Sequence, residues 1–417
     1  MNGGRYIRLY ALLSACVLSL IATAGWSQSL TWLGTLPGGN SSRAFDISSD
    51  GSVVVGGADN AAGRTRAFRW TASGGMQDLG TLTGYTYGNE AYGVSADGAV
   101  VVGTAYNTAY RYRAFRWTAS NGMLDIGTLG GSESGAWDVS ADGSVVVGWA
   151  INAAGQTRAF RRSASGGMQN LGTLPGGSLS EAFGVSADGS VVVGKAYDAA
   201  GQTRAFRWTA AGGMQNLGTL PGGSLSAAYG VSADGSVVVG LALSDAFYFR
   251  AFRWSASGGM QDLGTLGGNS SEAYSVSADG SVVVGLARNA AGQNRPFRWT
   301  VSGGMEDLNT TYASLLTNGS MLWEARAISP NGRYIVGLGY NAVTGRDEAF
   351  LLDTGPRCTA HNGDVDANGC VDDADLLAVL FAFGSTGSTL GREDANCDGT
   401  VDDADLLQVL FNFGSGC

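Results

Sequence analysis

The stretch VSADGSVVVG at residues 185–194 decides the architecture, because near copies of it recur six more times along the chain. Each copy has an acidic or amide residue before its turn glycine, at Asp50, Asp97, Asp142, Asp188, Asp234, Asp279 and Asn331. Two other markers, similar to RAFRW and to LGTL, also occur seven times in the same order. The chain is therefore a tandem repeat of seven units, with a period of about 46 residues, within the range of repeat architectures.

Each repeat is expected to form four short strands. In the fourth repeat, residues 181–186 and 190–196 flank the Ala-Asp-Gly turn, and residues 204–209 and 214–220 flank a Gly-Gly pair. Three consecutive valines favour a strand that is buried on both faces. The repeated Asp is interpreted as a turn-forming residue, since Asp and Gly accept the backbone angles of tight turns.

Four strands in each of seven repeats predict an all-β fold, a seven-bladed β-propeller over residues 29–354. The first LGTL marker, at residues 33–36, precedes the first complete repeat, and the last repeat ends at residues 349–352 without a marker of its own. The N-terminal strand would thus complete the last blade and close the ring. An open solenoid is the alternative, and it would need caps at its ends.

The AFRW, GGM and LGTL segments resemble HAF repeats, a family of bacterial extracellular repeats. The resemblance covers about three quarters of the chain and implies an exported repeat protein with no defined activity. The histidine of that family is replaced by arginine in six repeats and by Glu348 in the last. These arginines, expected to pair with carboxylates or to pack along aromatic rings, are Arg66, Arg113, Arg158, Arg204, Arg250 and Arg295.

Composition and charge exclude several classes. The 67 glycines have no triplet period, and Pro is scarce, so the chain is not collagen-like. The net charge of −10 is confined to residues 358–417, which hold eleven acidic residues and one basic residue, Arg392. The rest of the chain is balanced and has no basic patch, so we expect no nucleic-acid partner.

The N-terminus resembles an export signal. Arg5 and Arg8 precede an apolar run over residues 9–24, which ends in a small-x-small cleavage pattern. We expect a signal peptide over residues 1–24 and, after its removal, no transmembrane helix. Residues 13–16 also resemble a lipobox, so lipid anchoring through Cys16 is the alternative. The mature chain is expected to be secreted or held at the cell surface, and to be a monomer.

One repeated position is a candidate ligand site. The residues seven positions before each turn residue begin the strands that would lie innermost, near the rim of the central channel. They include four glutamates that could bind a cation, a sugar or a basic side chain: Glu90, Glu181, Glu272 and Glu324. The alternative is that they are solvated loop residues.

Catalysis has no evident centre in the repeats. Residues 29–357 contain neither His nor Cys, so no Ser-His-Asp or Cys-His set can form there. We assign no catalytic residue. A carboxylate-pair glycosidase or a lyase stays open, although no pair of carboxylates stands out.

The acidic tail contains two twelve-residue loops that fit calcium coordination, at residues 364–375 and 394–405. Asp, Asn and backbone oxygens at positions 1, 3, 5, 7, 9 and 12 suit a hard cation. A short apolar helix is expected after each loop. Two such units about 30 residues apart, with Asp at position 12, resemble a type I dockerin over residues 358–417. The resemblance implies two Ca²⁺ ions and a cohesin-like partner, with these ligands: Asp364, Asp366, Asn368, Cys370, Asp372 and Asp375, then Asp394, Asn396, Asp398, Thr400, Asp402 and Asp405.

Four cysteines lie in the tail, namely Cys358, Cys370, Cys397 and Cys417. An even number in a small exported segment predicts two disulfides, with three possible pairings. We expect Cys358–Cys417 to join the ends and Cys370–Cys397 to join the loops. A zinc site is the alternative, but the chain has no CxxC pair and a single histidine, His361.

Together these features predict an exported, non-catalytic binding protein. The propeller would bind a glycan or a protein, and the calcium-dependent tail would attach it to a surface or cohesin-like partner. The alternatives are an extracellular polysaccharide-active enzyme recruited through its tail, and a structural surface or matrix protein.

Overall fold

The computed structural model describes residues 28–163, 166–355, 362–366, 370–385, 395, 401–415 and 417. The chain divides into two compact units, one spanning Ser29–Thr354 and one that includes the tail from Gly355 to Cys417. The expected signal peptide and the lipobox at Cys16 lie outside the described residues. No helix among the described residues is long and apolar enough to cross a membrane.

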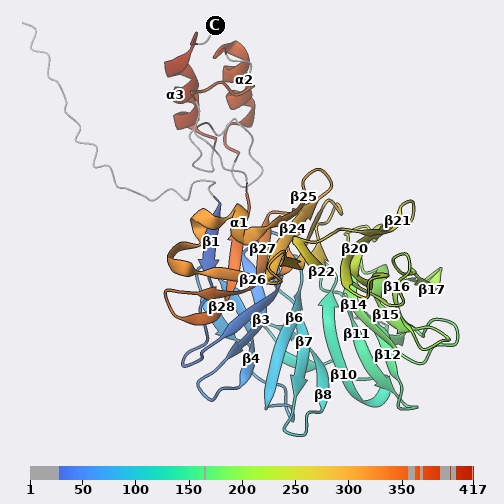
Figure 1. Ribbon diagram of the computed structural model, residues 1–417. Helices are drawn as coiled ribbons and strands as arrows, with labels where there is room; N and C mark the ends of the chain where they lie inside the picture. The colour runs from blue at the N-terminus through green and yellow to red at the C-terminus, as the bar shows by residue number, and fades with distance from the viewer. Residues whose placement is uncertain are drawn as a thin grey trace, which may run out of the picture. The chain divides into compact units, whose positions relative to one another are not determined.

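The seven repeats of the unit Ser29–Thr354 form a ring of seven four-stranded antiparallel sheets, as predicted (Figure 1). The first three blades comprise β2 (Ser42–Ile47), β3 (Val53–Asp59), β4 (Thr65–Thr71) and β5 (Gly75–Asp78); β6 (Gly88–Val94), β7 (Val101–Tyr106), β8 (Tyr112–Thr118) and β9 (Gly122–Asp125); and β10 (Gly130–Val139), β11 (Val145–Asn152), β12 (Thr157–Ser163) and β13 (Gly167–Asn170). The next three comprise β14 (Ser180–Val185), β15 (Val191–Tyr197), β16 (Thr203–Thr209) and β17 (Gly213–Asn216); β18 (Ser226–Val231), β19 (Val237–Leu243), β20 (Phe249–Ser255) and β21 (Gly259–Asp262); and β22 (Gly267–Val276), β23 (Val282–Asn289), β24 (Asn294–Thr300) and β25 (Gly304–Asp307).

The N-terminal strand closes the ring. The seventh blade comprises β26 (Met321–Ile328), β27 (Tyr334–Asn341), β28 (Arg346–Asp353) and, at its outer edge, β1 (Ser29–Trp32). β1 pairs antiparallel with β28, with Trp32 opposite Phe350. The first strands of successive blades contact one another all the way round, including β26 with β2. The predicted closure is confirmed, and the solenoid alternative is wrong.

The repeated Asp forms the tight turn as expected. In the fourth repeat, the Asp188 carboxylate accepts hydrogen bonds from the Ser190 backbone N–H at 2.9 Å and from the Ser186 hydroxyl at 2.6 Å. The Ser186 hydroxyl in turn accepts the Val191 N–H at 2.9 Å. These bonds satisfy the polar groups of the hairpin end, and Gly189 supplies its positive φ of 72°.

A buried polar side chain joins each blade to the one before it at six of the seven junctions. This residue, which we call the latch residue, accepts the backbone N–H of the Ala in the preceding blade's RAF segment, or in the equivalent EAF segment of the seventh blade. The six Ala–latch pairs are Ala349–Ser42, Ala67–Asn89, Ala114–Ser134, Ala159–Ser180, Ala205–Ser226 and Ala251–Ser271. Each latch residue also donates to the Gly carbonyl of an LGTL segment, as Ser180 does to Gly172.

Arginines and phenylalanines of the RAFRW marker hold the blades together. In four blades the second arginine donates through Nε to the turn-glycine carbonyl of the next blade, as Arg161 does to Gly189 at 2.8 Å. The phenylalanines are fully buried in all seven blades. The first arginines, at the position of the family's histidine, have mixed partners: Arg204 pairs with Asp198 at 3.1 Å, whereas Arg158 donates to the Ser178 carbonyl at 2.7 Å.

The fourth strand of each repeat is shorter than the sequence suggests. In the fourth repeat it ends at Asn216 instead of residue 220. The Asn216 side chain accepts the Gly218 N–H at 2.8 Å, and Gly218 has a φ of 80°, so the chain turns away from the sheet there. Buried Leu217 and Leu220 then anchor the connection to the next blade.

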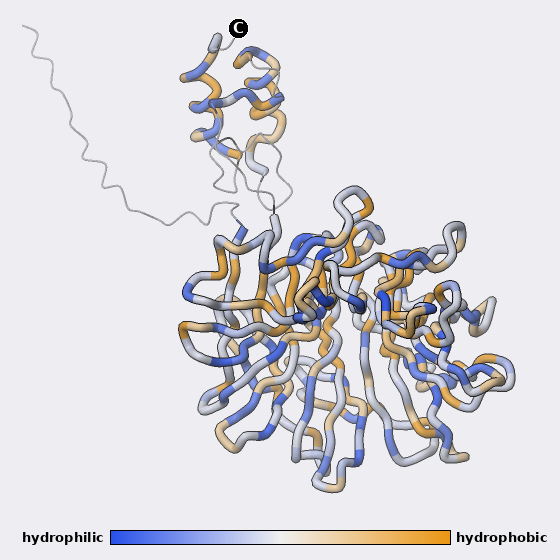
Figure 2. The backbone as a smooth tube through the Cα atoms, viewed as in Figure 1, coloured by the Kyte–Doolittle hydropathy of each residue, from blue (hydrophilic) through white to orange (hydrophobic). Residues whose placement is uncertain are grey.

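The tail unit contains two equivalent helices, α2 (Asp373–Ala382) and α3 (Asp403–Asn412). Asp372 and Asp402 cap their N-termini in the same way, each forming a capping box with the residue three positions on. Val371, Val379, Val401 and Val409 are fully buried between them. Figure 2 shows both hydrophobic and hydrophilic residues along the two helices.

Candidate functional sites in the channel and the tail

The four candidate glutamates lie within innermost strands, near the start for Glu90 and Glu181 and in the middle for Glu272 and Glu324, and each is half-buried and has a partner. Glu90 and Glu272 accept hydrogen bonds from the hydroxyls of Tyr92 and Tyr274, two residues further on. Lys195 lies 3.2 Å from the Glu181 carboxylate, and Arg326 lies 2.7 Å from that of Glu324. These partners stabilise the carboxylates individually. All four glutamates lie within strands, so they are strand residues and not loop residues.

A collar of aromatic side chains, which the sequence analysis missed, surrounds the channel next to the glutamates. In each innermost strand the ladder is bulged, and in six blades an aromatic residue occupies the bulge: Phe45, Tyr92, Trp137, Phe183, Tyr229 and Tyr274. Neighbouring ring centroids are 4.4 to 6.1 Å apart. The seventh blade has Arg326 instead, with its guanidinium 4.6 Å from the Tyr274 centroid. The available sequence signal was an aromatic residue five positions before the turn residue in six of the seven repeats.

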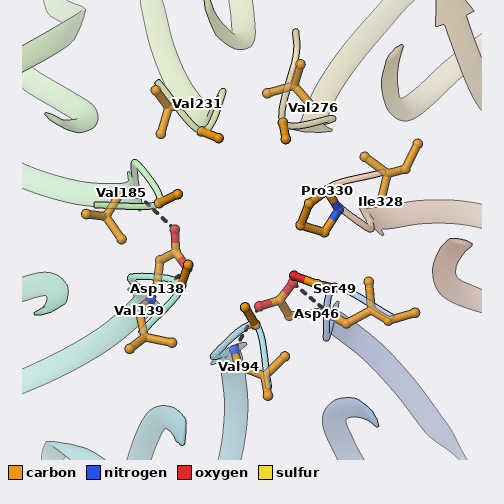
Figure 3. A pocket seen from close by; sticks show the side chains of 16 residues that line it. Asp46, Ser49, Val94, Asp138, Val139, Val185, Val231, Val276, Ile328 and Pro330 are labelled. Atoms are coloured by element: carbon orange, nitrogen blue, oxygen red, sulfur yellow. Dashed lines mark hydrogen bonds between the residues drawn. The ribbon is translucent and has the colours of Figure 1, made fainter. Parts of the chain in front are cut away.

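The turn end of the channel contains a cavity of about 280 Å³ with two carboxylates, Asp46 and Asp138 (Figure 3). The corresponding residues in the other five blades are glycine, serine or alanine. Each carboxylate accepts the N–H of the following residue and one from the next blade, Asp46 from Val94 at 2.8 Å and Asp138 from Val185 at 2.9 Å. Burial raises the pKa of Asp46 to about 7, while the two backbone hydrogen bonds act in the opposite direction and lower it. Burial, together with the charge of Asp46, raises the pKa of Asp138 to about 8.

Backbone hydrogen bonds form a belt around this end of the channel. In successive blades the residue before the turn residue donates its backbone N–H to the carbonyl of the equivalent residue in the next blade. The series begins with the Ser49 N–H, 3.0 Å from the Ala96 carbonyl, and ends with the Ala278 N–H, 2.8 Å from the Pro330 carbonyl. Six of these bonds are present. The seventh cannot form, because Pro330 has no N–H to donate. Asp46 lies beside this gap, between the seventh and first blades (Figure 3).

The first tail loop brings together three of its expected calcium ligands. Carboxylate oxygens of Asp364, Asp366 and Asp375 lie within 4.8 Å of one another. The buried Asp375 carboxylate accepts the backbone N–H groups of Val365, Asp366 and Asp372, at 2.6, 3.1 and 2.9 Å. These bonds fold the loop back onto the first turn of α2. Such a set of carboxylate oxygens fits a hard cation such as Ca²⁺.

The second loop is described only in part. Asp405 accepts the Asp402 N–H at 2.9 Å, as Asp375 does from Asp372 in the first loop. The expected ligands that lie outside the described residues are Asn368, Asp394, Asn396, Asp398 and Thr400.

The tail forms a disulfide that differs from the expected pairing, because Cys370 is bonded to Cys417. Backbone hydrogen bonds explain the difference. Val371 accepts the Gly414 N–H at 2.7 Å and donates to the Ser415 carbonyl at 3.0 Å, so the C-terminal segment runs beside the first loop. This excludes the expected Cys358–Cys417 and Cys370–Cys397 bonds. Cys358 and Cys397 themselves lie outside the described residues.

The closed ring of four-stranded blades defines the unit Ser29–Thr354 as a seven-bladed β-propeller. Neither the comparison with protein-family models nor that with curated protein sequences finds a match. Similar solved structures include the β-propeller domain of the Trilobed protease from Pyrococcus furiosus, with 10% identity, a TM-score of 0.48, and coverage of 75% of this chain and 95% of that one. TolB from Acinetobacter baumannii has 15% identity and a TM-score of 0.43, covering 74% of this chain and 78% of that one.

Proposed function

We propose that this chain is an exported, non-catalytic binding protein. Its propeller binds a glycan or a protein, and its tail is a dockerin-like module that binds two Ca²⁺ ions and attaches the protein to a surface or cohesin-like partner. The single observation that carries the proposal is the clustering of Asp364, Asp366 and Asp375 in the loop before the first of two equivalently capped helices and in its first turn.

Calcium would complete the first loop. Three carboxylates brought within 4.8 Å of one another repel in the absence of a cation, and a bound Ca²⁺ would offset that repulsion. The sequence supplies further oxygen ligands for both loops at the same spacing. The tail has a small apolar core of valines, so calcium and the Cys370–Cys417 disulfide would both stabilise it.

A protein partner is supported by the exposed faces of the two tail helices. Phe381 is 87% exposed on α2, and its counterpart Phe411 is 83% exposed on α3. Around them lie further exposed apolar side chains at equivalent positions, Leu377, Leu380, Leu407 and Leu410. Exposed aromatic and aliphatic side chains at this density are typical of protein-binding surfaces.

A structural role for Asp46 and Asp138 is supported by their hydrogen bonds. Both oxygens of each carboxylate accept backbone N–H groups, one of them from the next blade. The two side chains therefore brace neighbouring blades.

A pull-down from the native cell envelope and secreted fraction tests the attachment, with the mature protein as bait in calcium and in EDTA. We expect one or more partners that are retained only in calcium. Replacing both Phe381 and Phe411 by Ser should abolish retention, whereas Phe247→Ser, at an exposed position on the propeller, should not. Retention that EDTA leaves unchanged would contradict the role of the tail.

A further inference from the structure

The junction between the sixth and seventh blades differs from the other six. The latch bond is missing there, because Pro296 replaces the donor alanine and has no N–H. Leu322 takes the paired position of the latch residue, opposite Gly339, and its side chain has no acceptor. The connection into this blade is also longer, and it folds into α1 (Leu308–Thr311), η1 (Ala313–Leu315) and η2 (Thr317–Gly319).

At this altered junction a tryptophan, Trp323, is partly exposed on the surface. The ladder between β26 and β27 is shifted between Leu322 and Glu324, so Trp323 is an extra residue in the strand and its side chain is 37% exposed. Its ring is nearly parallel to that of Tyr340, at 8° between planes and 6.4 Å between centroids. The Asn309 side chain holds the adjacent backbone by bonding both the N–H and the carbonyl of Leu322, at 2.8 and 2.9 Å.

Trp323 lines a hollow of about 380 Å³ that combines apolar and polar walls. Leu286 and Leu338 add apolar surface, and Asn294, Arg295 and Glu324 add hydrogen-bonding groups. The Asn294 side chain is exposed and has no hydrogen-bond partner among the described residues, so its amide is free to bind a ligand. A mostly apolar wall with a few polar groups is the usual composition of a small-molecule site.

A second hollow of about 360 Å³ shares one lining residue with the first, Leu338 of the seventh blade. Its walls are polar and include Arg43, Asp59, Glu90 and Asp347. Together the two hollows are lined by four acidic side chains and by two basic ones, Arg43 and Arg295. An excess of carboxylates disfavours a polyanionic ligand, whereas hydroxyl groups can donate to carboxylates and accept from arginine.

We propose that these two neighbouring hollows bind a neutral glycan, with one sugar ring lying on the indole of Trp323 and its hydroxyls reaching Asn294 and the charged residues. The inference deepens the proposed binding function of the propeller and rests on it. A sugar ring fits because it presents an apolar C–H face to the indole and polar edges to the walls. Because Trp323 and Asn294 have no counterparts in the other blades, the propeller would hold one such site and not seven.

Affinity electrophoresis tests the site. The mature protein in calcium is run through gels containing soluble xylan, mixed-linkage β-glucan or galactomannan, and through gels containing alginate or polygalacturonate. We expect retardation by at least one neutral polysaccharide and not by the two anionic ones. Trp323→Ala should weaken that binding about tenfold or more, equivalent to about 1.4 kcal/mol.

Two further variants separate the site from general effects. Trp323→Phe keeps an aromatic surface and should retain part of the binding, while Phe247→Ala removes an exposed ring of the fifth blade and should leave binding unchanged. No retardation in any neutral gel, equal retardation of Trp323→Ala, or retardation only in the anionic gels would each overturn the inference. Calcium-dependent retention of a partner in the pull-down would survive any of these results, so a failure of this site is distinguishable from a failure of the attachment.

Discussion

The hydroxyl of Ser180 accepts the backbone N–H of Ala159, in the preceding blade, at 2.9 Å and donates to the carbonyl of Gly172. One fully buried side chain thus joins an RAF segment, an LGTL segment and an innermost strand. The same arrangement recurs at five other junctions, and it gives a physical reason why the markers share one period.

Ser180→Ala should destabilise the propeller. The substitution leaves the Ala159 N–H and the Gly172 carbonyl without partners in a buried junction, and unsatisfied buried groups cost about 1–3 kcal/mol. We expect a loss of this size in the free energy of unfolding, measured by denaturant titration followed through tryptophan fluorescence.

Ser178→Ala is the matched control, because it makes the same substitution two residues away at an exposed side chain. It should change the free energy of unfolding by less than about 0.5 kcal/mol. Equal effects of the two substitutions would show that the latch bond does not stabilise the junction.

The stability of the propeller should fall as the pH rises above about 5. The pKa values of Asp46 and Asp138 are raised to about 7 and 8 from 3.8, chiefly by burial, so the folded chain binds more protons than the unfolded chain between about pH 4 and pH 8. Stability is lost as the pH rises through this interval. We expect a higher Tm at about pH 5 than at about pH 9, with tryptophan fluorescence as the readout.

The contribution of the turn aspartates to the stability of the propeller should have the opposite dependence on pH. Hydrogen bonds, first from the serine two residues before, lower the pKa of Asp142 and Asp234 to about 2, so their contribution is lost as the pH falls below about 4. Asp138→Asn should therefore reduce the fall in Tm above pH 5, whereas Asp234→Asn should change the Tm only below about pH 4. An unchanged slope in Asp138→Asn would show that this carboxylate does not cause the decline.

The repeat period was sufficient to predict the propeller, because each marker occupies one position in the blade. The aromatic collar could have been predicted on the same basis, since Tyr92 and Trp137 stand at equivalent positions in neighbouring repeats. The hollow at Trp323 could not, because it depends on a strand irregularity and an inserted connection that no other repeat shares.

The pairing of Cys370 with Cys417 could not be predicted from spacing either. It depends on the C-terminal segment hydrogen-bonding to Val371, a contact between residues far apart in sequence. Likewise, the bracing role of Asp138 depends on the next blade, which places the Val185 N–H within reach. Contacts of this kind form only in the folded units, the tail for Cys370 and the ring for Asp138, and leave no local pattern in the sequence.

Removal of calcium should unfold the tail and spare the propeller. Residues 358–417 contain neither Trp nor Tyr, so tryptophan fluorescence reports on the propeller, whereas α2 and α3 dominate the helical signal in far-UV circular dichroism. We expect EDTA to reduce the helical signal, because the carboxylates of Asp364, Asp366 and Asp375 repel without a cation. The fluorescence spectrum and the Tm measured by fluorescence should stay unchanged, and calcium should restore the helical signal.

Asp375→Asn should weaken the calcium affinity, read from the helical signal, by about tenfold or more, or about 1.4 kcal/mol. Asp375 combines a carboxylate of the cluster with three hydrogen bonds that fold the loop. Asp373→Asn is the control, since this side chain is exposed and lies outside the cluster, and it should cost only the few tenths of a kcal/mol of a charge at a helix N-terminus. A helical signal that EDTA does not alter, or equal effects of the two variants, would refute a calcium site at this loop.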